Sequence, residues 1–257
     1  MSVDRIAGYL ERRRTTAHPL EQALIAAACG SPSGQEPPID LNTYIRQAPD
    51  FTSRLKHALL NALLMACGAG HSPGPVPDRS SFSRTGLHPW AKVQTTAVKV
   101  IWAPVPDASF RAEHRDVDVL LSTLNRDGIR EGNLLVHLSA LHALHRLGGH
   151  DTVVRDGLDT VLRHQRRDGG IPFFTDTDTW CTATAGVALL AAGAPDDVIY
   201  SITTHLVGRQ KPNGAWSVSD ISEVTDADDT SVVRELLQTR ADPAHRNAIE
   251  RGRQALR

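Results

Sequence analysis

The chain has 257 residues, of which 40% are hydrophobic, and its formal net charge is −1. This length is enough for one large domain or two small ones with a sizeable core. The near-neutral charge argues against a general nucleic-acid binder and against electrostatic anchoring to an acidic membrane, because both need a basic face.

Other bulk features concern location and redox state. The three cysteines, Cys29, Cys67 and Cys181, are odd in number and far apart, which disfavours a disulfide framework or a zinc ribbon. We see no signal peptide, and no apolar run approaches the ~20 residues that span a bilayer. The sequence therefore predicts a cytoplasmic protein without a transmembrane segment.

The first third of the chain is predicted to be helical. Apolar periodicity indicates helices over residues 3–14, 19–29 and 51–68. Residues 30–38 form a breaker cluster, and residues 70–86 form a loop rich in Gly, Pro and Ser. We place the softest boundary in that loop. The predicted division is an N-terminal helical region, 1–85, and a repeat region, 86–257, unless 1–257 is one continuous α/α domain.

Strand signals are scarce, and only Val98 to Val105 resembles a strand. From about residue 115 onward, three segments share one plan, in which a polar turn with Asp-Gly or Asn-Gly precedes a helix. The turns begin at Asn125, Gln165 and Gln210, and the helices are expected at about 133–147, 178–192 and 228–239. Further helices, such as 150–165 and 196–209, lie between them.

The spacing of these segments indicates a repeat. Gln165 and Gln210 are 45 residues apart, and the Asp-Gly pairs at Asp127 and Asp168 are 41 apart. A period of ~40–50 residues with two helices per unit is typical of helical-hairpin repeats. Such hairpins bury their apolar faces only by stacking, as an open solenoid or a closed ring. We therefore predict an all-α fold, an α/α toroid of helical hairpins that is either complete or incomplete.

Two motifs follow each other on this repeat. Gln210 to Trp216 reads Gln-x-x-Asn-Gly-x-Trp, and Asp226 to Thr230 reads Asp-Ala-Asp-Asp-Thr. Together they resemble the Gln/Trp repeat and the Asp-x-Asp-Asp-Thr motif of squalene–hopene cyclases and class II terpene cyclases. The resemblance covers residues from about 130 to the end. The copy at Gln165 keeps Gln and Gly but has Ile171 in place of the tryptophan.

The resemblance implies a protonation-initiated cyclase, an isomerase-type enzyme that acts on a prenyl diphosphate or a related isoprenoid. Its general acid is then Asp228, and Asp226 and Asp229 orient the proton and stabilise the carboxylate. Close carboxyl groups do not all ionise cheaply, which fits a site that keeps one of them protonated. Thr230 is expected to help cap the helix and to lie at the substrate site. The motif is expected at the start of an inner helix, facing a pocket, with Asp228 less exposed than a surface aspartate.

The same residues have an ordinary structural interpretation, because Asp and Thr before a helical run are common N-caps. Aromatic candidates for stabilising a carbocation are Trp180, Trp216, Phe173 and Phe174. For Trp216 we favour packing between repeats. Core packing is also expected for Trp90 and Trp102, which lie outside the matched region.

Alternatives stay open at this point. The spacing Asp226-x-Asp228-x-Thr230 also fits a haloacid-dehalogenase phosphatase, which needs an apolar strand before the motif. Aromatics make up only 5% of the chain, and the chain ends soon after Thr230. A helical-repeat scaffold without catalysis, or half of a split cyclase, is therefore the second hypothesis. A partner chain or a homo-oligomer would then complete the barrel. Mg²⁺ is expected only if the substrate is a diphosphate.

Overall fold

The computed structural model describes residues 3–15, 18–30, 41, 45, 50–67, 76–124 and 128–257. The breaker cluster at 31–38, the first part of the predicted loop and the turn at 125–127 lie outside these residues. Within the described ranges the regular elements are all helical, with no strand, which confirms the all-α prediction. No helix among the described residues has the length and apolarity needed to cross a membrane.

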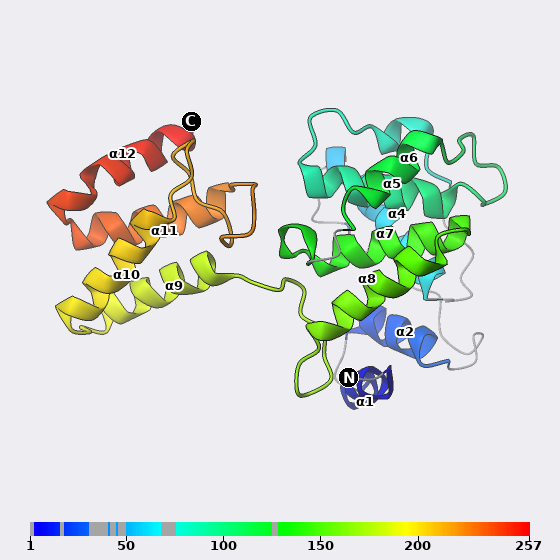
Figure 1. Ribbon diagram of the computed structural model, residues 1–257, viewed down its shortest axis with the longest axis horizontal. Helices are drawn as coiled ribbons and strands as arrows, with labels where there is room; N and C mark the ends of the chain where they lie inside the picture. The colour runs from blue at the N-terminus through cyan, green and yellow to red at the C-terminus, as the bar shows by residue number, and fades with distance from the viewer. Residues whose placement is uncertain are drawn as a thin grey trace. The chain divides into compact units, whose positions relative to one another are not determined.

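The chain divides into two compact units between Phe173 and Phe174. The division predicted at residue 85 stays a prediction, as does closure of the hairpins into a ring. Unit 1 holds seven of the described α-helices, coloured blue to green in Figure 1: α1 (Val3–Arg13), α2 (Pro19–Ala28), α4 (Asp50–Ala66), α5 (Pro89–Trp102), α6 (His114–Leu121), α7 (Leu134–Leu147) and α8 (Asp151–Arg163). Unit 2 holds α9 (Asp178–Ala191), α10 (Asp196–Gly208), α11 (Ala227–Arg240) and α12 (Arg246–Ala255). Short 3-10 helices η1, η2 and η3 span Arg79–Phe82, Arg130–Gly132 and Pro243–His245.

Helix α5 is the centre of unit 1, where it packs against α4, α6 and α7. Trp102 is fully buried there, and its indole Nε1 donates to the carbonyl oxygen of Ala58 at 2.9 Å. Core packing is thus confirmed for Trp102, whereas Trp90 is 36% exposed at the start of the helix. The strand suggested for Val98 to Val105 is wrong, because α5 continues to Trp102 and a turn follows.

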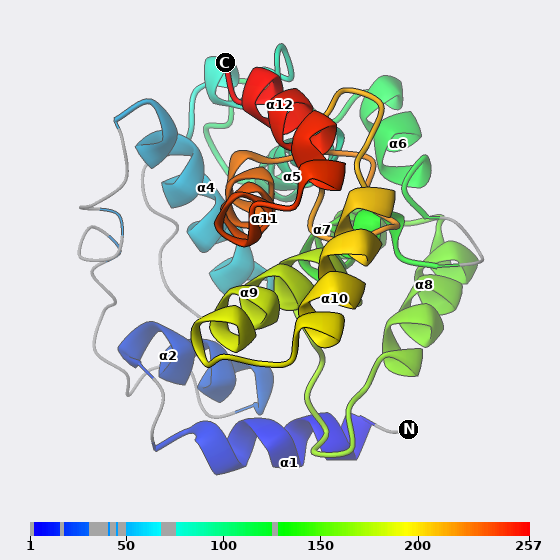
Figure 2. The same cartoon turned by 90° about the vertical axis from the view of Figure 1, so that its left-hand side faces the viewer.

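Unit 2 is built around the packing of α9 against α10 and α11, with α12 on α11 (Figure 2). Its core contains Trp216, Leu206, Val233, Leu236 and Leu237, all fully buried. Trp216 precedes α11 in sequence, and its Nε1 donates to the carbonyl oxygen of Leu206 at 2.7 Å. The indole thereby ties the end of α10 to the helix that carries the acidic motif.

The turns at Gln165 and Gln210 have the same hydrogen bonds, which supports the predicted repeat. In each turn the glutamine Nε2 donates to the carbonyl oxygen four residues on, Gly169 at 3.1 Å and Gly214 at 2.8 Å. The residue after each glutamine donates its backbone N–H to the carbonyl oxygen of Gly170 or Ala215. Both Gly169 and Gly214 have positive φ, +95° and +86°, a region that favours glycine.

A helix is docked on each of these turns in the same way. Arg251 of α12 donates to the carbonyl oxygens of Lys211 and Pro212 at 2.9 and 3.3 Å. Arg5 of α1 donates to the corresponding oxygens of Arg166 and Arg167 at 2.9 and 2.7 Å. Figure 2 shows the loop after α8 beside α1. Helix α1 therefore has in unit 1 the role that α12 has in unit 2.

Candidate functional site

The acidic motif begins α11, as the sequence predicted. Asp226 is the N-cap residue, and its Oδ1 accepts the backbone N–H of Asp229 at 2.9 Å. The capping interpretation is therefore confirmed for Asp226. Capping leaves the other two carboxyl groups of the motif free of this bond.

Thr230 joins the start of α11 to the buried tryptophan. Its hydroxyl donates to the carbonyl oxygen of Asp226 at 2.6 Å and accepts the backbone N–H of Trp216 at 3.0 Å. The backbone N–H of Asp226 also donates to the carbonyl oxygen of Trp216 at 3.1 Å. Thr230 is fully buried, so the expected cap is instead a link between two segments. This link fixes the position of the aspartates on the unit.

The three carboxyl groups have different surroundings. Asp226 and Asp228 are exposed in unit 2, whereas Asp229 is only 2% exposed. Burial, and after it a hydrogen bond with Asp226 and the charges of Asp226 and Asp228, together raise the pKa of Asp229 to about 7. The buried Oδ1 of Asp229 has no hydrogen-bond partner among the described residues. Asp229 therefore still holds its proton in a large fraction of molecules near neutral pH, where an ordinary aspartate is fully ionised.

The expectation that Asp228 is less exposed than a surface aspartate is wrong for this unit. The buried face of α11 contains Val233, Leu236 and Leu237, and its helical period passes through Asp229 and Thr230. Asp228 falls on the opposite side, toward solvent. The placement of the motif against a pocket stays a prediction.

The aromatic candidates are distributed differently from one another. Trp216 is fully buried beneath α12, where a Cβ on Gly252 would lie 2.8 Å from the indole, so packing accounts for it. Trp180, in the first turn of α9, is 40% exposed. Phe173 is 58% exposed and Phe174 is half-buried, at the division between the units. Trp180 is the candidate of unit 2 with an accessible ring.

Clusters of metal-ligating side chains are absent from the described part of the chain. No group of three or more His, Cys, Asp or Glu residues there has a metal-binding arrangement. In the motif, Asp226 is engaged as a cap and Asp229 favours its proton, which opposes metal ligation. The described residues thus hold no preformed group of three ligands, and Mg²⁺ stays an expectation tied to a diphosphate substrate.

The described residues before the motif lack the strand that the phosphatase alternative requires there. Residues 219–225, before the motif, contain no strand, and the first aspartate caps a helix instead of following a strand. A nucleophilic aspartate of the dehalogenase type sits at the end of a strand. The geometry of unit 2 thus favours the cyclase interpretation over the phosphatase.

Comparison with known proteins bears on the same question. No family model matches the chain. The chain is similar to drimenyl diphosphate synthases. The relative from Streptantibioticus cattleyicolor is 29% identical over 211 residues, which cover 77% of this chain and 39% of the relative. The relative from Streptomyces showdoensis is 29% identical over 257 residues, which cover 95% of this chain and 48% of the relative.

Two consequences follow from these similarities. They support the terpene cyclase resemblance at its coarser level, without favouring the squalene–hopene type. The chain also spans less than half the length of either relative. The activity and substrate of the whole relatives are therefore matters for a proposal about this chain.

Proposed function

We propose that this chain carries the acid motif of a class II terpene cyclase that acts on a prenyl diphosphate. The observation that supports this most directly is the buried carboxyl group of Asp229 beside two exposed carboxyl groups at the start of α11. Asp229 has a pKa of about 7 and an unpartnered buried oxygen, and it follows two exposed aspartates, Asp226 and Asp228, in the chain. A group that protonates carbon has to hold its proton near neutral pH, and a raised carboxyl pKa meets that requirement.

The proposed reaction is an isomerisation. A carboxyl proton adds to a terminal alkene carbon, and the π electrons of the alkene form the new C–H bond. The resulting carbocation is attacked by further double bonds, which become the ring C–C bonds. Loss of a proton from a neighbouring carbon ends the reaction, so no atoms are lost and the C–O bond to diphosphate stays intact.

Two aspartates compete for the role of general acid. The family resemblance gives the role to Asp228, which is exposed on unit 2 and so accessible to a substrate. In that case Asp229 and Asp226 hold the proton network behind it. Burial favours Asp229 itself as the residue that stores the proton. We propose Asp228 as the donor. We propose Trp180, the exposed tryptophan of unit 2, as the aromatic side chain that stabilises the carbocation.

Asparagine variants test the proposal. The full chain, alone or with a chain that supplies further helices, is incubated with farnesyl or geranylgeranyl diphosphate, and products are identified by mass spectrometry. We expect a cyclic product that retains diphosphate. Asp228→Asn should abolish it, because an amide cannot donate the proton and a lost general acid costs at least ~10²–10⁴-fold. Loss of the product only in Asp229→Asn would move the donor role to Asp229.

A matched control separates chemistry from folding. Asp197→Asn changes an exposed aspartate in the first turn of α10, a helix of the same unit. It should leave both the helical content and the product unchanged. If Asp228→Asn and Asp229→Asn both kept near-normal product formation, the motif would serve only to start α11. The proton donor would then lie elsewhere. Absence of any cyclic product from the unmodified chain, alone and with added helices, would instead favour the scaffold hypothesis.

A further inference from the structure

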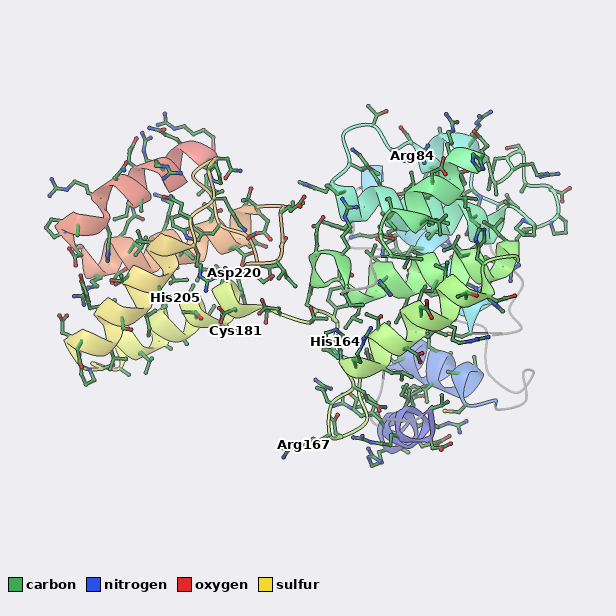
Figure 3. All side chains as sticks on the ribbon, in the orientation of Figure 1. Arg84, His164, Arg167, Cys181, His205 and Asp220 are labelled. Carbon is green, nitrogen blue, oxygen red and sulfur yellow. The ribbon has the colours of Figure 1, made fainter. Side chains whose placement is uncertain are left out.

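A polar hollow in unit 1 is lined by four cationic side chains. It has a volume of about 430 Å³ and lies among η1, α5 and α6. Arg79, Arg84, Lys99 and Arg115 line it. Figure 3 labels Arg84 on this part of unit 1. None of these residues belongs to the motif of α11.

The inner part of the hollow contains a fixed pair of cations. Asp116 is 1% exposed and accepts from Lys99 Nζ at 2.6 Å and from Arg84 Nη1 at 3.3 Å. Its Oδ2 also accepts the backbone N–H of Glu113 at 2.9 Å. Lys99 is only 7% exposed, so its charge is held in position and partly shielded from water. Asp116 thereby pre-orients both cations.

The outer part is more open. Arg79 and Arg115 are 69% and 62% exposed, and each pairs with Glu113, at 3.6 and 2.7 Å. Lys99 also contacts Glu113, at 3.2 Å. Four cations face two carboxylates, which leaves an excess of two positive charges. An exposed ion pair is weak and exchanges readily for a better partner.

A serine, a threonine and one aromatic ring also line the hollow, namely Ser83, Thr85 and Phe82. The hydroxyl of Thr96 accepts from Arg84 Nη1 at 3.4 Å and donates to the carbonyl oxygen of Lys92 at 2.7 Å, so it helps to hold Arg84 in place. Guanidinium groups with hydroxyl and ammonium donors are the usual set for phosphate oxygens. A cationic ligand would be repelled by the excess positive charge of this hollow.

We propose that this hollow binds a phosphate or diphosphate group, free or as the head of an ester. The anion contacts Arg84 and Lys99 on the inner side, and Arg79 and Arg115 exchange Glu113 for its oxygens. The site lies in unit 1 and needs no proton transfer, so it goes beyond the proposed cyclase function. Its test also requires no turnover.

The test is isothermal titration of the full chain with inorganic diphosphate in the presence of a metal chelator. We expect binding that weakens as sodium chloride is raised, because salt screens the attraction. Arg115→Gln should weaken it about tenfold, the factor that corresponds to one charge-assisted hydrogen bond. Glu113→Gln should strengthen it severalfold, since it removes the competing carboxylate while the amide still accepts hydrogen bonds.

The control variant is Arg54→Gln, which changes a 79% exposed arginine of the same unit that pairs with Asp78 at 3.7 Å. It should bind diphosphate as the unmodified chain does. Circular dichroism checks that all variants stay folded. Arg115 and Glu113 are exposed enough for the substitutions to leave the core intact.

Each outcome decides the proposal. Competition between farnesyl diphosphate and inorganic diphosphate would identify an ester head group as the occupant, and binding of inorganic diphosphate alone would identify a free anion. Absence of binding at millimolar diphosphate would overturn the site. So would an equal loss in Arg54→Gln and Arg115→Gln, or a weakening in Glu113→Gln, because the anion would then lie elsewhere.

Discussion

Asp229 is the residue whose environment departs most from that of an ordinary aspartate. Its pKa of about 7 in the folded chain compares with 3.8 for an ordinary aspartate. The folded state therefore keeps a proton that the unfolded state has lost across this window. Protonated Asp229 therefore contributes to the free energy of unfolding. This contribution is complete below pH ~4, decreases as the pH rises toward ~7 and is absent above that.

Asp229→Asn is expected to remove this pH dependence. An amide cannot ionise, so the variant should be more stable than the unmodified chain above pH ~7, by up to about 4 kcal/mol for a shift of this size. The measurement is the thermal midpoint at about pH 5 and about pH 8. Asp197→Asn, in the first turn of α10, should change neither. A stability of the unmodified chain that rises across this window would contradict the assigned pKa.

Thr230 is a second residue with a specific task. Thr230→Val removes the hydroxyl that accepts the buried N–H of Trp216. An unsatisfied buried donor costs about 1–3 kcal/mol, so amides of α11 should exchange with solvent deuterium faster. Thr230→Ser keeps the hydroxyl and should restore most of the protection. Equal protection in Thr230→Val and Thr230→Ser would show that the hydroxyl is not what holds the motif.

At the scale of elements, the helices with clear turn residues were predicted almost to the residue. Predicted spans such as 178–192 and 196–209 became Asp178–Ala191 and Asp196–Gly208. Helix α5 was missed for a physical reason. Residues Thr95 to Trp102 are buried on every side, so no amphipathic period is present, and the β-branched residues resemble a strand.

The site was predictable in part by the same reasoning. The spacing of the motif placed it correctly at a helix start. The motif alone does not indicate which of the adjacent aspartates is buried. The signal was present in the apolar period of α11, because Val233 and Leu236 lie on the face of Asp229 and not of Asp228. The polar hollow of unit 1 was not predicted. Its residues Arg84, Lys99 and Arg115 are distant in sequence and come together only in the folded unit.

The repeat turns make a prediction about elements. Gly214 and Gly193 both have positive φ in unit 2, +86° and +72°, so alanine at either costs about 1–2 kcal/mol. At Gly214 the new Cβ would also lie 2.7 Å from the carbonyl oxygen of Arg251, whereas nothing lies within 4 Å at Gly193. Gly214→Ala should therefore cost a further ~1–3 kcal/mol.

Hydrogen exchange measures this difference directly. Gly214→Ala should speed exchange in α12, which is docked on the turn, and leave α5 of unit 1 unchanged. Gly193→Ala should affect α12 much less. If both variants loosened α12 equally, docking on the Gln210 turn would not be what holds that helix.

At the scale of the whole molecule, the two units carry different groups of charged side chains. Unit 2 supplies the carboxyl cluster, and unit 1 supplies the cationic hollow. The chain spans less than half the length of its relatives, so turnover with a chain that supplies further helices is part of the proposal. Sequence repeats predicted the hairpins, but they carry no information on how such hairpins close.

The central claim is that cyclisation begins with a proton from the motif. It is tested most directly by running the reaction in deuterium oxide and weighing the product. Carboxyl protons exchange with solvent, so a protonation-initiated product should retain its diphosphate and carry one deuterium at the carbon that was protonated. A cyclic product without deuterium, or one formed with release of diphosphate, would contradict the account.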